Sequence, residues 1–137
     1  MRTIERHVRF EEVDALQYMW HGRYASWLED GREDFGRHYG ISYLDFHAAG
    51  VATPLKTLSI NFIAPLRYAA TYQIETSLLW NEAAVIEFNY RILDDAGSVM
   101  TEAETTQLMI SLDNELLLSL PGFYKAFCQQ WQNGLLK

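Results

Sequence analysis

Hydrophobic and polar positions change their period along the chain. Residues 3–10 alternate between the two types of side chain, which predicts a first strand with one mixed face. Between Gly22 and Tyr39 the apolar residues instead fall three or four positions apart, at Tyr24, Trp27, Leu28, Gly31 and Phe35, while charged residues, Arg32 among them, mostly occupy the other faces. This spacing predicts an amphipathic helix that ends at Gly40 and that another element can approach closely at Gly31.

Alternation with a period of two returns after a loop that we expect to run through residues 47–50. It predicts four strands, at residues 56–64, 72–80, 85–93 and about 99–112. The connections between them are short, which favours antiparallel neighbours. Pro121 and Gly122 then open a last helix, whose apolar residues Phe123, Tyr124, Phe127 and Trp131 have helical spacing.

These elements predict an α+β fold. A single long helix has to bury its apolar stripe, and the only large surface available is the sheet that follows it. We therefore expect an antiparallel sheet wrapped around one long central helix, with a small C-terminal helix. The chain has 137 residues, which suits one domain over residues 1–137.

Composition narrows the classes of function. The formal net charge is -7, which argues against binding to nucleic acid or to an anionic membrane surface. Apolar runs stay well short of the ~20 residues that a membrane span requires, and the first ten residues lack a signal-peptide core, so we expect a cytoplasmic protein. The one cysteine, Cys128, is expected to be a half-buried helix residue, and the four histidines have no metal-site spacing.

The stretch DALQYMWHGRY, residues 14–24, holds the candidate chemistry. Asp14 stands seven positions before His21 and Gly22, and the residues between include Leu16, Tyr18, Met19 and Trp20. These apolar side chains are expected to form a pocket wall that leaves the Asp14 carboxylate poorly solvated and therefore more reactive. The predicted helix start at His21 and Gly22 offers backbone N–H groups to an anion. The residues alone leave other roles open: Asp14 as a turn aspartate, His21 as a structural side chain, and Trp20 and Tyr24 as core residues.

Residues 8–32, VRFEEVDALQYMWHGRYASWLEDGR, resemble the N-terminal signature of hotdog-fold acyl thioesterases of the 4-hydroxybenzoyl-CoA thioesterase and short acyl-CoA thioester hydrolase type. The residues that match without a gap are Asp14, His21, Tyr24, Trp27, Leu28 and Glu29. The resemblance continues through residues 50–79 and 104–121, so it covers nearly the whole chain. It implies the hotdog fold and an enzyme that hydrolyses an acyl-CoA or acyl carrier protein thioester.

The resemblance also implies roles for residues. Asp14 would be the nucleophile or the general base, and the backbone N–H of His21 would bind the carbonyl oxygen. Glu29 would meet the far end of the acyl group, although a solvated surface role is open as well. The predicted substrate contacts are Gln17, Tyr18, Trp20, Gly22, Tyr24 and Glu29. No metal or redox cofactor is implied, and the family works as homodimers or homotetramers with the pantetheine arm between subunits.

Departures from the family pattern keep alternatives open. Glu12 replaces the first acid of the motif, and Gln17 replaces a glycine. Basic residues that often contact coenzyme A phosphates are absent from residues 80–84 and 114–118, so an acyl carrier protein remains a possible carrier, with Arg23, Lys56, Arg67 and Arg91 as candidates for its basic patch. The competing functions are a hotdog dehydratase or hydratase and a non-catalytic acyl-pantetheine binding module.

Overall fold

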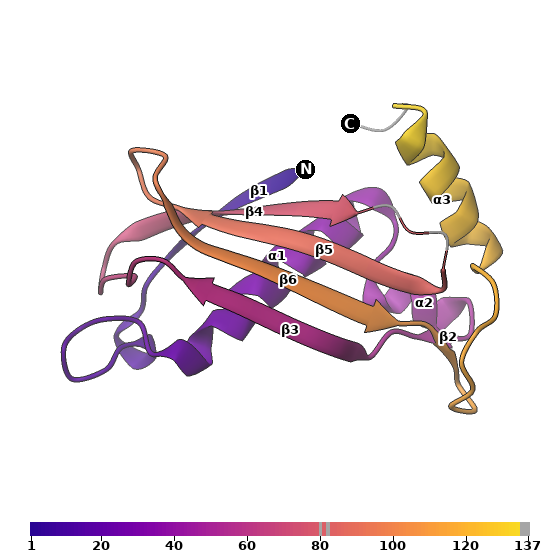
Figure 1. The fold of residues 1–137 in the computed structure, drawn as a ribbon, viewed down its shortest axis with the longest axis horizontal. Coiled ribbons are helices and arrows are strands. Elements are labelled where there is room, and N and C mark those ends of the chain that lie inside the picture. Colours follow the sequence, from indigo (N-terminus) through magenta and orange to yellow (C-terminus); the bar gives the residue numbers. More distant parts are fainter. Residues whose placement is uncertain (80, 82, 135–137) are drawn as a thin grey trace.

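The computed structural model describes residues 1–79, 81 and 83–134 (Figure 1). Two single turns of 3-10 helix, Phe10–Glu12 and His21–Arg23, lie between the first strand and the long helix. The other elements, in chain order, are β1 Arg2–His7, α1 Tyr24–Tyr39, α2 Tyr43–Ala48, β2 Val51–Ala52, β3 Leu55–Phe62, β4 Thr71–Leu79, β5 Val85–Leu93, β6 Val99–Leu108, β7 Ile110–Ser111 and α3 Gly122–Gln132.

The main sheet is antiparallel, and its five strands lie in the order β1-β4-β5-β6-β3. Helix α1 crosses one face of this sheet and packs over β1, β4 and β5 (Figure 1). Strands β2 and β7 form a separate two-stranded sheet, and α3 packs at the end of the molecule near α2. The predicted α+β hotdog architecture is confirmed.

The strands predicted from alternation agree closely with the structure. Strand β5 has the predicted bounds, and β3 and β4 start one residue earlier than expected. Trp80, at the end of the predicted strand 72–80, lies outside the described residues. The long run predicted for residues 99–112 is interrupted at Met109, so it forms β6 and β7.

The segment before Gly50, which we expected to end in a loop over residues 47–50, contains the short helix α2. Its N-cap is Ser42, whose side chain accepts a hydrogen bond from the backbone N–H of Asp45, while the Asp45 carboxylate accepts from the backbone N–H of Ser42. This reciprocal capping satisfies the first turn of a helix that is too short for an apolar period to reveal.

Helix α1 lies very close to the sheet at Gly31. A Cβ atom on Gly31 would lie 2.4 Å from Oγ1 of Thr76 and 3.2 Å from Cγ2 of Ile74, both on β4. The close approach predicted at this position is confirmed. The helix ends as predicted at Gly40, which has the left-handed φ of 74°.

The sheet face beneath α1 is covered unevenly. Its buried residues on β4 and β5 include Ile74, Phe88 and Ile92. On the edge strand β3 the same face stays partly open: Leu58 is 41% exposed and Phe62 is 49% exposed. Both residues pair with buried threonines of β6, which places them on the inner face. An apolar strip therefore borders the free edge of the sheet.

Within the described residues, no helix combines the length and apolar character that crossing a bilayer needs.

Candidate active site

The segment between β1 and α1 folds into a small hairpin that holds Asp14 at its base. Val13 bridges to Met19, and the N–H of Asp14 donates to the carbonyl of Tyr18 at 2.8 Å. Gln17 closes the turn, since its N–H donates to the carbonyl of Asp14 at 3.0 Å and its φ is 66°. The tight turn that glycine usually makes is therefore present, with Gln17 in the left-handed conformation that favours glycine.

This hairpin docks onto residues 66–68. The N–H of Met19 donates to the carbonyl of Leu66 at 2.7 Å, and the N–H of Tyr68 donates to the carbonyl of Gln17 at 2.9 Å. The guanidinium of Arg67 lies 5.6 Å from the centre of the Tyr18 ring. Backbone hydrogen bonds and a cation–π contact thus fix the hairpin against a neighbouring segment.

The two oxygens of Asp14 have different surroundings. Oδ1 accepts the backbone N–H of Leu16 at 2.9 Å and that of Tyr18 at 3.2 Å, so the turn role left open by the sequence is present. Within the described residues Oδ2 has no hydrogen-bond partner, and the side chain is exposed. One oxygen therefore orients the carboxylate and the other is available for chemistry.

The expected apolar pocket around Asp14 is not formed within one protomer. Leu16 is 74% exposed and Trp20 is 50% exposed, so these two side chains face solvent instead of covering the carboxylate. Of the apolar residues between Asp14 and His21, Met19 is buried and Tyr18 is half-buried. The desolvation predicted from the sequence would thus require a surface from outside the protomer.

The start of the long helix lies next to the hairpin. The N–H of Trp20 donates to the carbonyl of Glu12 at 2.8 Å, and the chain then enters the 3-10 turn at His21. In the described part of the chain, the N–H groups of His21 and Gly22 find no internal acceptor. Free N–H groups at the positive end of a helix can receive a developing oxyanion.

Gly22 leaves space for the indole of Trp20. A Cβ atom at position 22 would lie 2.2 Å from the Trp20 ring, and the rings of Trp20 and His21 are 4.9 Å apart. The indole therefore covers the backbone at the helix start. Any side chain at position 22 would displace it.

Glu12, which the sequence marked only as a departure from the family motif, anchors this region. It is 3% exposed and accepts the indole N–H of Trp27 at 2.9 Å, the backbone N–H of Arg9 at 3.0 Å and the guanidinium of Arg6 at 2.8 Å. Burial works to raise the pKa of Glu12, but the hydrogen bonds from Arg9 and Trp27 and the charge of Arg6 outweigh it and hold that pKa below its usual range. Two residues before Asp14, Glu12 ties the hairpin to α1.

Tyr24 and Glu29 lie in contrasting positions on α1. Tyr24 is 2% exposed and packs edge-to-face on Phe62 of β3, with ring centres 4.7 Å apart, and burial raises its pKa. It is a core residue, so its predicted contact with substrate stays a prediction. Glu29 is exposed, and its carboxylate accepts the hydroxyl of Tyr43 on α2 at 3.0 Å.

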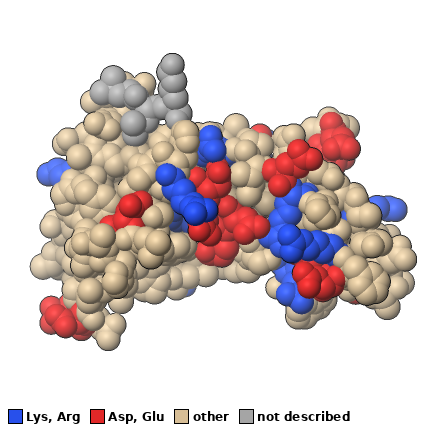
Figure 2. All heavy atoms as spheres, turned by 180° about the vertical axis from the view of Figure 1, so that it is seen from behind, with Lys and Arg blue, Asp and Glu red and all other residues tan. Residues whose placement is uncertain are grey.

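The two flanks of α1 differ in chemistry. On the flank facing β1, Asp30 and Asp34 pair with Arg6 and Arg2. The opposite flank carries Gly22, Ala25 and Glu29, which are exposed and lie three and four positions apart on one helical face. Figure 2 shows basic and acidic atoms interleaved over the helix side of the molecule instead of one basic surface. The flank towards β3 thus lies beside the open apolar strip. Along it the small residues Gly22 and Ala25 come first, and the carboxylate of Glu29 follows one turn further on.

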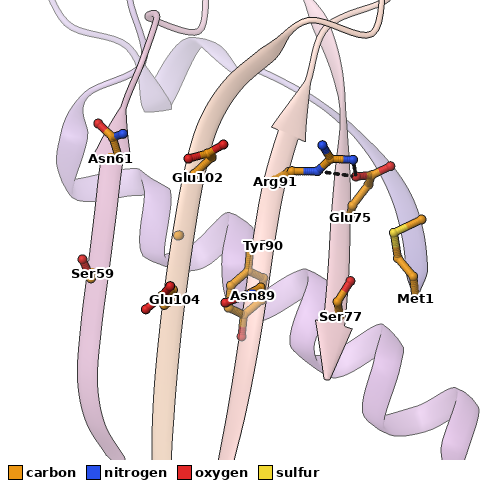
Figure 3. Close-up of a pocket in the computed structure, with 11 residues that line it drawn as sticks. Met1, Ser59, Asn61, Glu75, Ser77, Asn89, Tyr90, Arg91, Glu102 and Glu104 are labelled. Carbon is orange, nitrogen blue, oxygen red and sulfur yellow. Dashed lines mark hydrogen bonds and ion pairs between the residues drawn. The ribbon is translucent and has the colours of Figure 1, made fainter. Parts of the chain in front are cut away.

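A hollow of about 570 Å³ lies elsewhere, on the outer face of the sheet (Figure 3). Its lining includes the acids Glu75, Glu102 and Glu104, and Arg91 donates to Glu75 at 2.6 Å. None of the predicted site residues lines it. Because a carboxylate already engages Arg91, its place in a basic patch for a carrier protein has little support.

Cys128 is a poor candidate for a further reactive group. Cys128 is 1% exposed on α3, and burial raises the pKa of its thiol, which lowers the fraction of reactive thiolate. The predicted structural role agrees with this position, although the residue is more deeply buried than expected. No cluster of three or more metal-ligating side chains occurs among the described residues.

The chain is similar in sequence and in fold to known thioesterase-like proteins. Residues 8–130 match the family described as the thioesterase-like superfamily. A putative acyl-CoA thioesterase of Bacillus subtilis, YneP, is 26% identical over 80% of this chain and 80% of its own length. The acyl-CoA thioester hydrolase YbgC of Escherichia coli is 26% identical over 77% of this chain and 78% of its own. A DHNA-CoA thioesterase structure from Staphylococcus aureus superposes with a TM-score of 0.83 at 24% identity, covering 97% of this chain and 93% of that one.

Proposed function

Since the chain belongs to the thioesterase-like superfamily, we propose that it is an acyl thioester hydrolase that converts an acyl-CoA or acyl carrier protein thioester to the free acid and the thiol. The observation that carries the proposal is the asymmetry of Asp14. Its Oδ1 is held by two N–H groups of its own turn, whereas Oδ2 accepts no hydrogen bond from the residues that the structure describes. A fixed carboxylate beside a helix start whose first N–H groups have no internal acceptor in the described residues is an acyl-transfer arrangement.

In the proposed reaction the N–H at His21 and the positive helix end bind the carbonyl oxygen of the thioester. The free oxygen of Asp14 then acts in one of two ways. As a general base it takes a proton from water, whose oxygen forms the new bond to the carbonyl carbon. As a nucleophile it forms that bond itself, and water afterwards cleaves the mixed anhydride. In both routes the C–S bond breaks, the thiolate leaves, and the products are one carboxylic acid and one thiol.

The acyl group would lie along the flank of α1 that faces β3. The helical rise from His21 to Glu29 spans about 12 Å, and Gly22 and Ala25 add no large side chain of their own to this line. The half-exposed ring of Trp20 lies against Gly22 and has to rotate away for an acyl group to bind there. Leu58 and Phe62 supply an apolar wall on the other side. Glu29 stands at the far end, which supports its proposed contact with the acyl tip.

A second copy of the chain would complete the site. In the described part of the chain no strand pairs with the outer edge of β3, and the inner face beside it exposes Leu55, Leu58 and Phe62. Unprotected apolar edges of this kind favour pairing with another strand. A homodimer joined at β3, alone or within a homotetramer, would cover this strip and supply the apolar surface that Asp14 lacks in one protomer.

The direct test is thiol release from a matched panel of acyl-CoA and acyl carrier protein thioesters, followed with a thiol reagent. We expect a stoichiometric thiol for each acid formed, and the carrier that supports the higher kcat/KM identifies the physiological class. A change at the acyl double bond or hydroxyl without thiol release would instead identify a hydratase or dehydratase. Tight binding without turnover across the panel would identify a binding module. Single-turnover hydrolysis in oxygen-labelled water would establish attack by Asp14 itself if the label enters its carboxylate.

A further inference from the structure

Arg32 is a buried cation with no carboxylate partner. Its side chain is 0% exposed, and it makes no ion pair within the described residues. Its guanidinium lies between the rings of Tyr43 and Phe88, at 5.0 and 4.8 Å from their centres. A buried charge is costly unless its surroundings compensate it, so the groups around Arg32 form a built polar cluster and not an incidental surface contact.

Nη2 of Arg32 donates to the carbonyl of Ile41 at 3.0 Å, and its Nε begins a chain of hydrogen bonds that leads to Glu29. Nε of Arg32 can only donate, and it donates to Oε1 of Gln107 at 2.9 Å. The amide nitrogen of Gln107 therefore faces the other way and donates to the carbonyl of Thr53 at 2.8 Å and to the hydroxyl of Tyr43 at 3.2 Å. Because the Tyr43 oxygen accepts there, its single proton is left for Glu29.

Glu29 is thus capped by a fixed phenol. The Tyr43 hydroxyl lies 3.0 Å from Oε2 and 3.3 Å from Oε1 of Glu29, so one donor spans both carboxylate oxygens. Burial, followed by the nearby charge of Glu29, raises the pKa of Tyr43 to about 12, so this phenol keeps its proton at neutral pH. The capping group is a hydroxyl on an aromatic ring, which is the same chemical group that a hydroxylated acyl tip would present to Glu29.

We propose that Tyr43 is a specificity-determining residue whose hydroxyl occupies Glu29 and so selects acyl groups that carry no hydroxyl at their far end. The inference rests on the proposed thioesterase function and on the acyl group reaching Glu29. A hydroxylated acyl tip has to compete with a tethered phenol for the same carboxylate, while a plain aryl or alkyl tip does not. Arg32 and Gln107 act as positioning residues, since they direct the single hydroxyl proton of Tyr43 towards Glu29.

The experiment compares matched thioesters that differ only in the terminal hydroxyl: benzoyl with 4-hydroxybenzoyl, and octanoyl with 8-hydroxyoctanoyl. The readout is the ratio of kcat/KM for the hydroxylated member over the plain member. For the wild-type protein we expect a ratio below one. Tyr43→Phe should raise the ratio at least about tenfold, because a hydrogen bond to a freed carboxylate becomes available to the substrate. In the double variant Tyr43→Phe with Glu29→Gln, which lacks the charged acceptor, the ratio should return towards the wild-type value.

Tyr39→Phe is the matched control, because Tyr39 is the last residue of α1 and packs against Phe35 and against Trp131 of α3. It removes a phenol hydroxyl of the same size and should leave the ratio unchanged. If the wild-type protein hydrolyses these thioesters and Tyr43→Phe leaves the ratio unaltered, the specificity role of Tyr43 is wrong while the proposed function stands. If the wild-type protein hydrolyses no thioester of the full panel, both the proposed function and this inference are wrong.

Discussion

The indole nitrogen of Trp27 donates a 2.9 Å hydrogen bond to the carboxylate of Glu12 inside the protein. This bond joins α1 to the segment that precedes Asp14. The same carboxylate accepts from Arg6 of β1, so strand, hairpin and helix meet at one buried acid. The position of the candidate catalytic carboxylate relative to the helix start therefore depends on a residue two positions away from it.

Replacing Glu12 by glutamine should lower the free energy of unfolding at pH 7 by about 2 kcal/mol, because the buried partners lose a charged acceptor. The folded-state pKa of Glu12 lies below the ordinary value of 4.5, so the ionised acid stabilises the fold above that pH. This contribution is lost as the pH falls through the lower, folded-state pKa. Denaturant unfolding of both proteins from pH 7 to pH 3 should show the difference shrink below pH 4.5; a constant difference would contradict the assignment.

Asp14→Asn should lose at least about a hundredfold in kcat while keeping the wild-type thermal stability. The asparagine Oδ1 can still accept the N–H groups of Leu16 and Tyr18, so the hairpin persists, but the amide neither attacks a thioester nor takes a proton from water. Thiol release and a thermal melt measure the two effects. Asp95→Asn, at an exposed turn position, is the matched control and should change neither. Nearly full activity in Asp14→Asn would overturn the mechanism.

Sequence patterns predicted those parts of the molecule in which one chain buries its own residues. The alternation of apolar and polar residues predicted both ends of β5 correctly, because every second side chain of that strand faces α1. The apolar stripe of the helix likewise placed Gly31 where helix and sheet meet. The surroundings of Asp14 were not predictable in this way. Periodicity shows that Leu16 and Trp20 are apolar, but not whether the same chain covers them, and here it does not.

Arg32 and Tyr43 show a second limit of the sequence. Charge alone places Arg32 on the solvated face of α1, since arginine is almost never fully buried unless paired. Its burial depends on Gln107, a residue 75 positions away, and on two aromatic rings. A local signal did exist for α2, because Ser42 and Asp45 have the spacing of a capping box. The capping-box spacing predicts where the short helix begins, but it does not predict that Tyr43 reaches Glu29.

Gly31→Ala should destabilise the protein by about 1–2 kcal/mol, although alanine is the better helix former by about 1 kcal/mol. The added Cβ would lie 2.4 Å from the hydroxyl of Thr76, which is fully buried, and 3.2 Å from the side chain of Ile74. Gly22→Ala, in the 3-10 turn before α1, is the comparison, because there the obstacle is the half-exposed ring of Trp20, which can rotate away. Denaturant unfolding should show a clear loss for Gly31→Ala and a smaller one for Gly22→Ala. Equal losses would contradict the close helix–sheet contact.

Leu58→Asp should convert the protein to a monomer and lower kcat/KM for thioesters by at least about tenfold. It places a charge in the apolar strip beside β3, where a second copy would have to desolvate it. Since Leu58 is 41% exposed in one protomer, the fold itself should tolerate the change, which circular dichroism can check. Ser59→Asp adds the same charge on the outer face of the same strand and should leave at least a dimer. Light scattering measures the mass of each variant. A monomeric and fully active wild-type protein would show that a second copy is not needed, and that the open strip is the complete acyl site.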